Sequence, residues 1–309
     1  MKAIRFHEYG DIDVLRYEET PTPRPRSGEA LVAVAATAFN PVDTWFRAGI
    51  IDQIFPVPFP HTLGLDLAGT VVAHGPGTED PAIGTEVIGF LPMTGPGAAA
   101  EYVTAPAEVL VRAPANIPLI DAAAIPVPAL TAWQALFEHG NLVAGQSVLV
   151  NGAGGGVGGF VVQLAKQAGA TVIATASPRS ADPTRAAGAD HIIDYTAATI
   201  TDTLDAPVDL AINLVAGTGT DTANLLNVIK PGGTLVTATP PGAEFPDHTQ
   251  RVVFFSVRSD TTQLTHIVEL IDSGQLHLDI SARRPLSDTA QLHQQSEDGA
   301  LRGRTLLIP

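Results

Sequence analysis

A run of glycines at residues 151–159 constrains this chain most, because it stands between a strand-like and a helix-like segment. It reads Asn-Gly-Ala-Gly-Gly-Gly-Val-Gly-Gly. Residues 146–150 are apolar and β-branched, as in a buried strand, and residues 160–168 have helical composition and stop at Gly169. A second apolar run, 171–176, follows directly. Strand, glycine turn, helix and strand within about thirty residues predict a dinucleotide-binding unit rather than a merely flexible loop.

Such a turn needs glycine for physical reasons. The chain must leave the strand sharply, let a pyrophosphate approach the backbone, and pack the helix closely on the sheet, with the unpaired N–H groups of the helix start facing the anion. In the usual G-x-G-x-x-G spacing the three positions are Ala153, Gly155 and Gly158, so alanine replaces the first glycine. The residues of the turn expected to contact the cofactor are Ala153, Gly154, Gly155, Gly156 and Val157.

The end of the second strand favours NADPH. A site for NAD usually has an acidic residue about 20 positions after the glycines, which binds the ribose 2′-hydroxyl. Residues 176–180 read Ala-Ser-Pro-Arg-Ser and include no acid. Arginine and hydroxyl groups bind a 2′-phosphate through charge-assisted hydrogen bonds, whereas a carboxylate repels it. We expect Ser177, Arg179 and Ser180 to contact the cofactor; the alternative is that Arg179 only caps a solvated loop.

The composition excludes several kinds of chemistry. The chain has 309 residues, enough for about two domains. It has no cysteine, which removes disulfides, thiolate catalysis and cysteine-based zinc sites, and its nine histidines form no metal-binding motif, so no metal is expected. The net charge of −15 argues against a nucleic-acid partner. The first residues contain no apolar signal segment, and no run reads as a membrane span, so we expect a cytoplasmic protein.

The pattern of apolar runs changes along the chain. The first hundred residues are rich in proline and glycine, as in a small irregular barrel, with strand-like runs at 30–34, 67–72 and 86–89. From about Ile120, helical and strand-like segments alternate, which predicts an α/β domain with a doubly wound parallel sheet. The expected helices are 129–139, 158–168 and 183–187, and the expected strands are 146–151, 171–176, 191–195, 208–215 and 233–236. The last fifty residues contain an expected helix at 262–273 and a strand at 304–308.

In this order, the pieces resemble the zinc-independent quinone oxidoreductase branch of the medium-chain dehydrogenase/reductase superfamily, which includes the zeta-crystallin-like NADPH:quinone reductases. The matching stretches span nearly the whole chain and are 39–44, 63–69, 128–133, 153–158, 188–195 and 302–304. Zinc alcohol dehydrogenases of the superfamily have Gly-His-Glu where this chain has Gly64-Leu65-Asp66, so leucine replaces a zinc-ligating histidine. The resemblance therefore implies a zinc-independent enzyme that transfers hydride from NADPH to a quinone or another α,β-unsaturated carbonyl compound.

The resemblance also implies an architecture. A Rossmann NADPH-binding domain, residues 119–257, would be inserted in a GroES-like catalytic domain made of residues 1–118 and 258–309. The cofactor would bind in a cleft between the two domains. Family members are usually dimers, so a homodimer is expected.

Site residues follow from the same resemblance. Asn40, Asp43 and Thr131 match polar positions around the nicotinamide; Asn40 and Asp43 are the expected catalytic residues, and Thr131 an expected cofactor contact. The alternative for Asn40 and Asp43 is that they set a turn around Pro41. Trp45, the third expected catalytic residue, stands where many relatives have tyrosine, which leaves the proton donor open; its alternative is a core tryptophan.

Two further cofactor contacts are implied. Tyr195 matches a position near the adenine ribose-phosphate, and Arg304 stands where relatives often have lysine.

Other functions stay open at this point. Within enzymes, the chain could be a dedicated enone, enal or acyl-thioester reductase; for a thioester, a basic entry patch could include Arg251, Arg258, Arg283 and Arg284. Outside enzymes, it could be a redox-inert NADPH-binding protein. An RNA-binding role is disfavoured by the acidic charge. We expect a small-molecule partner, no nucleic acid and no membrane.

Overall fold

The computed structural model describes residues 1–245 and 248–309. The chain divides into two compact units, a first unit made of Met1–Val127 and Ser259–Pro309 and a second unit made of Pro128–Arg258. The expected domain borders, 118/119 and 257/258, differ mainly at residues 119–127. These lie in the first unit because helix α2 (Leu119–Ala122) packs on strands of that unit.

The first unit contains two sheets. The smaller has the strand order β2-β1-β4 and is made of β1 (Lys2–Phe6), β2 (Arg16–Glu19) and β4 (His61–Thr62). The larger has the order β15-β16-β3-β5-β6-β8, with β7 also paired to β3. Its strands are β3 (Glu29–Ala38), β5 (Asp66–His74), β6 (Glu86–Phe90), β7 (Tyr102–Pro106), β8 (Leu110–Arg112), β15 (Ile280–Pro285) and β16 (Arg304–Ile308).

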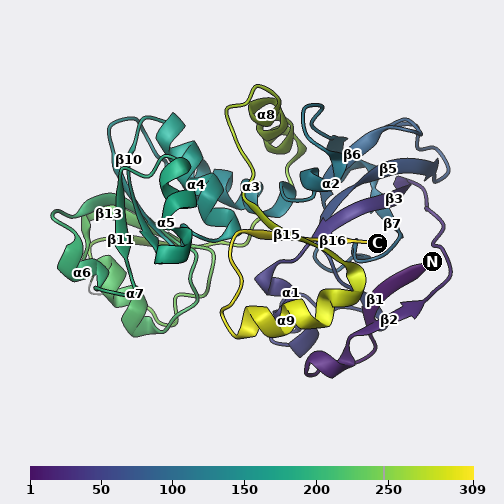
Figure 1. Cartoon of the computed structure of the whole chain (residues 1–309), viewed down its shortest axis with the longest axis horizontal. Coiled ribbons are helices and arrows are strands. Elements are labelled where there is room, and N and C mark those ends of the chain that lie inside the picture. Colours follow the sequence, from purple (N-terminus) through teal and green to yellow (C-terminus); the bar gives the residue numbers. More distant parts are fainter. Residues whose placement is uncertain (246–247) are drawn as a thin grey trace. The chain divides into compact units, whose positions relative to one another are not determined.

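Strand β3 organises this sheet. Its residues alternate between buried and half-buried positions, as the period of a strand with one face on the core requires. It pairs with β5, β7 and β16, so the C-terminal strand (yellow in Figure 1) joins the N-terminal sheet. The helices of the unit are α1 (Pro41–Ala48), α2, α8 (Thr261–Asp272) and α9 (Thr289–Glu297), with short 3-10 turns η1 (Ile12–Val14), η2 (Ala107–Val109) and η4 (Leu286–Asp288).

The second unit is built on a six-stranded parallel sheet with the order β11-β10-β9-β12-β13-β14. Its strands are β9 (Ser147–Asn151), β10 (Thr171–Ala176), β11 (His191–Asp194), β12 (Val208–Asn213), β13 (Ile229–Thr237) and β14 (Arg251–Phe254). Since β9 is followed by β10 on one side and flanked by β12 on the other, the strand order reverses between β9 and β12. Ligands of open α/β sheets bind at this switch point, beyond the carboxyl ends of the strands.

Helices cover the parallel sheet. They are α3 (Pro126–Trp133), which contains the border between the units, the π-helix η3 (Gln134–His139), α4 (Gly156–Gln167), α5 (Pro178–Ala186), α6 (Ile200–Thr203) and α7 (Gly219–Leu226). Helices α4 and α5 pack on β9, β10 and β11, and α7 packs on β13 and on α6 (Figure 1). The expected fold class, a Rossmann-type sheet together with a GroES-like β-rich domain, is confirmed. Among the helices of the described ranges, none combines the length and hydrophobicity that crossing a membrane requires.

Candidate functional site

The glycine turn between β9 and α4 leaves part of its backbone open. Gly155 is the N-cap of α4, and among the described atoms a Cβ built on it would meet only the carbonyl oxygen of Gly152, at an ordinary contact distance of 3.4 Å. Its φ of −88° and ψ of 172° suit any residue, so neither backbone strain nor packing requires glycine here. The missing side chain exposes the first N–H groups of α4 to an anion from outside the chain. The turn therefore fits a diphosphate group.

Two other glycines of the turn are required by packing. A Cβ on Gly158 would lie 2.5 Å from the Cα of Ala153, so α4 can approach the turn only with glycine there. A Cβ on Gly154 would lie 2.5 Å from Oγ of Ser180. The structure thus places Gly154 of the turn directly against Ser180, in the segment that follows β10.

The residues expected to bind a 2′-phosphate begin a helix. Helix α5 starts at Pro178, earlier than the expected residue 183, because proline suits the first helical position and Ser177 caps the helix. The backbone N–H of Ser177 donates to Oγ of Ser180 at 3.2 Å, and both serines are buried. Arg179 lies in the first turn of α5 and is exposed. Of these three residues, Arg179 is the one that a phosphate in solvent can reach.

Tyr195 emerges at the same edge of the sheet. Asp194 at the end of β11 is the register partner of Ala176 at the end of β10, so Tyr195 and Ser177 follow two neighbouring strands. The side chain of Tyr195 is 54% exposed, which leaves it available for a ligand. Thr131 lies in α3 and is buried.

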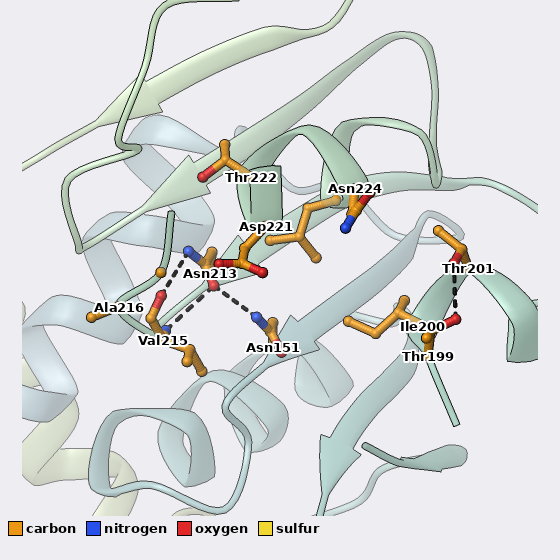
Figure 2. A pocket seen from close by; sticks show the side chains of 12 residues that line it. Asn151, Thr199, Ile200, Thr201, Asn213, Val215, Ala216, Asp221, Thr222 and Asn224 are labelled. Atoms are coloured by element: carbon orange, nitrogen blue, oxygen red, sulfur yellow. Dashed lines mark hydrogen bonds between the residues drawn. The ribbon is translucent and has the colours of Figure 1, made fainter. Parts of the chain in front are cut away.

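A pocket of about 420 Å³ lies at the carboxyl ends of β9 and β12, where the strand order reverses (Figure 2). Its lining residues are Asn151, Thr199, Ile200, Thr201, Asn213, Val215, Ala216, Gly217, Asp221, Thr222, Asn224 and Leu225. None of them was selected from the sequence as a site residue. One sequence signal was available: both strands end in asparagine, in Val-Leu-Val-Asn151 and Leu-Ala-Ile-Asn213.

The first unit holds a buried polar cluster around Asp66. The Arg304 guanidinium forms an ion pair of 2.5 Å with the Asp66 carboxylate and donates to Oδ1 of Asn40 at 2.9 Å. Nδ2 of Asn40 donates to Asp66 at 2.9 Å, and the backbone N–H of Val127 donates to the other Asp66 oxygen at 2.7 Å. Asn40, Asp66 and Arg304 are all buried. The structure thus gathers two of the expected site residues around Asp66, which the sequence analysis had not selected.

Asp43 adds a second buried carboxyl group. It is the N3 residue of α1, and one of its oxygens accepts the backbone N–H of Asn40 at 2.8 Å, so the two residues form a capping box around Pro41. Burial, together with the nearby Asp66 charge, raises the pKa of Asp43 to about 7. Trp45, in the same helix, is half-buried. The capping role of Asn40 and Asp43 is therefore visible in the structure, and their catalytic role stays a prediction.

The side chains at the position of the superfamily's zinc site are apolar or already paired. Leu65 is buried, and Asp66 is bonded to Arg304 and Asn40. Within residues 1–245 and 248–309, no cluster of three or more histidine, aspartate or glutamate side chains could hold a metal ion.

Comparison with known proteins assigns the family. The family model described as alcohol dehydrogenase GroES-like domain matches residues 26–115, and the one described as zinc-binding dehydrogenase matches residues 187–307. The chain is 30% identical to a chloroplast envelope quinone oxidoreductase homolog of Arabidopsis thaliana, over all of this chain and 98% of that protein. It is 33% identical to the NADPH-dependent alkenal/one oxidoreductase of the same plant, over all of this chain and 80% of that protein.

A solved structure agrees with these relatives. The quinone oxidoreductase from Coxiella burnetii is 30% identical and superposes with a TM-score of 0.89, covering 100% of this chain and 99% of that one. This similarity extends over both units. The names of these relatives all describe an oxidoreductase. The chain is therefore an oxidoreductase that belongs to the quinone oxidoreductase branch of the medium-chain dehydrogenase/reductase superfamily.

Proposed function

We propose that the chain binds NADPH and transfers hydride, without zinc, to a quinone or another α,β-unsaturated carbonyl compound. The observation that carries this proposal is the open backbone at Gly155, where glycine is required neither by strain nor by contacts with the described atoms. When neither strain nor packing requires glycine at a helix N-terminus, a ligand that must approach the backbone closely explains its presence.

The residues beside the turn favour NADPH over NADH. Arg179 is exposed on the first turn of α5, and the carboxyl end of β10 contributes no acidic side chain. The Arg179 guanidinium would neutralise the charge of a 2′-phosphate. The N–H groups in the first turn of α5 would also attract this phosphate. Tyr195, exposed at the same edge, is our second proposed contact with this phosphate. The relative whose name includes NADPH dependence supports this choice.

The pocket beyond β9 and β12 suits the adenosine part of the cofactor. Ile200 and Leu225 offer apolar contact, and Thr199 and Asn224 offer polar groups at the pocket wall. Seven of the twelve lining residues are polar, so the wall offers hydrogen-bond partners for the hydroxyl groups and ring nitrogens of an adenosine.

Bound NADPH supplies the hydride, so the chain has to orient the cofactor and supply a proton or a hydrogen-bond donor where negative charge develops. In the first unit we retain Asn40, Asp43 and Trp45 as the proposed catalytic residues. Asn40 is held rigidly by Asp66, Arg304 and Asp43. The half-buried indole of Trp45 can stack on a flat acceptor or donate its N–H.

Reduction of a carbon–carbon double bond in an enone or enal is the second candidate. The relative named alkenal/one oxidoreductase, at 33% identity, favours it. An acyl-thioester substrate has less support, because the four candidate arginines of an entry patch already have partners. These are His139 O for Arg251, Glu138 for Arg258, Asp121 for Arg283 and Gln291 for Arg284.

The test is NADPH oxidation by the purified protein with a panel of quinones and short 2-enones or 2-enals, with NADH in parallel. Turnover of quinones supports the first candidate, and turnover of enones alone supports the second. Binding of NADPH without turnover of any acceptor would point to a redox-inert protein. We also propose a homodimer and a cytoplasmic location, to be tested by light scattering and by imaging of the tagged protein.

A further inference from the structure

Four adjacent strands of the parallel sheet end in a continuous row of side-chain hydrogen bonds. Oγ1 of Thr175, at the end of β10, donates to Oδ1 of Asn151 at 3.0 Å. Nδ2 of Asn151, at the end of β9, donates to Oδ1 of Asn213 at 2.8 Å. Nδ2 of Asn213, at the end of β12, lies 3.4 Å from Oγ1 of Thr237 in β13. These four residues, here called the polar ladder, follow the order of the strands in the sheet.

The ladder also holds the main chain of the two loops that flank the switch point. Oγ1 of Thr175 accepts the N–H of Gly152, at the start of the glycine turn, at 2.9 Å. Oδ1 of Asn213 accepts the N–H of Val215 at 3.3 Å, and Nδ2 of Asn213 donates to the Val215 carbonyl oxygen at 3.1 Å (Figure 2). The Asn151–Asn213 bond is therefore the side-chain link between the glycine turn and the loop 214–217.

Burying the polar side chains of this link costs free energy unless their hydrogen-bonding groups have partners. Asn213 is 5% exposed and continues a strand of buried apolar residues. An amide in such a place is tolerated only when its donors and acceptors are satisfied. Here the amide oxygen of Asn213 accepts from Asn151 and from Val215, so both asparagines are fixed in one orientation. Two valines or isoleucines would keep the backbone hydrogen bond from the Leu214 N–H to the Asn151 carbonyl oxygen but would remove the side-chain link between the two loops.

We propose that Asn151 and Asn213 are positioning residues that couple the glycine turn to the loop 214–217, so that the diphosphate and adenosine contacts are ordered together before the cofactor binds. The proposal rests on the proposed function in one respect, that the ligand of both loops is NADPH. Neither side chain takes part in the hydride transfer. Preorganised loops improve binding because less conformational entropy is lost when the ligand arrives.

The first test is a double-mutant cycle with Asn151→Ala and Asn213→Ala, read as the Kd of NADPH by fluorescence titration. Each single variant should weaken NADPH binding about 10-fold, the size of one or two lost hydrogen bonds. The double variant should be little weaker than the singles, because both changes break the same link. Asn227→Ala, an exposed asparagine at the end of α7, is the matched control.

The second test needs no ligand. Hydrogen–deuterium exchange of the free protein should show that Asn151→Ala speeds exchange in residues 214–217, although Asn151 makes no side-chain bond to that loop in the described structure. The Asn227→Ala control should leave this loop unchanged. If exchange in 214–217 is unaffected, or if the two single losses in affinity multiply, the coupling is wrong. If the wild type fails to bind NADPH but the exchange result holds, the proposed function is wrong and the coupling stands.

Discussion

Replacing Asp43 by asparagine should stabilise the first unit, and by an amount that depends on pH. Asp43 is 3% exposed, and burial raises its pKa from 3.8 to about 7. The Arg304 guanidinium in its neighbourhood is already paired with Asp66, so among the described residues the Asp43 carboxylate has no ion-pair partner of its own. Its hydrogen bond from the Asn40 backbone can be kept by the amide oxygen of asparagine. The substitution therefore removes an ionisable group without removing the cap.

The magnitude follows from linkage. The folded protein holds the Asp43 proton more tightly than the unfolded chain does, so the contribution of this group to stability is lost as pH rises from 3.8 to about 7. A difference of about three pKa units corresponds to about 4 kcal/mol. The free energy of unfolding of Asp43→Asn should therefore be close to that of the wild type near pH 4 and up to about 4 kcal/mol higher near pH 8.

The assay is urea unfolding across this pH range, followed by the fluorescence of Trp45 in a Trp133→Phe background, so that the signal comes from the first unit. Asp205→Asn, at an exposed site of the second unit, is the control and should show no such trend. A stability difference between Asp43→Asn and wild type that stays constant with pH would refute the reasoning.

Three further predictions concern single side chains. Burial lowers the pKa of His293 to about 3, so wild-type stability should fall as pH drops below 6.5, and His293→Leu should reduce that fall in acid unfolding curves. Arg304→Met should cost about 3–5 kcal/mol in chemical unfolding, because it leaves the Asp66 carboxylate buried without its cation, and Arg304→Lys should cost clearly less. Arg179→Ala should raise the KM for NADPH about 10-fold and leave that for NADH nearly unchanged; equal effects on both cofactors would contradict a 2′-phosphate contact.

Local patterns predicted the central part of the second unit, residues 146–176, but not α6, α7 or β14. The segments β9, the glycine turn, α4 and β10 carry their own signals in apolar runs and glycine positions, so sequence predicted them within a few residues. The start of α5 was misplaced because only residues 183–187 were assigned to a helix. The serine cap and the proline at the first helical position were the signals for a helix there.

Local sequence patterns could not predict contacts between residues that are far apart in the chain. Arg304 and Asp66 are separated by 238 positions, and no spacing rule joins them. The π-helix at Gln134–His139 has the composition of an ordinary helix, so only the packed structure distinguishes it. Asn151 and Asn213 each resemble an ordinary residue at the end of a strand. Their side-chain hydrogen bond can be recognised only when the sheet places β9 beside β12.

The most direct test of the central claim is the Kd of NADPH for wild type and Gly155→Ala, measured by isothermal titration calorimetry. In the described structure the new Cβ would meet only Gly152 O, at 3.4 Å, so the unfolding midpoint should be nearly unchanged. NADPH binding should nevertheless weaken about 10-fold or more, because the methyl group occupies the space of the diphosphate. Gly159→Ala, whose Cβ would have no described neighbour within 4 Å, should bind like wild type. Wild-type affinity in Gly155→Ala, or no NADPH binding by the wild type, would contradict the account.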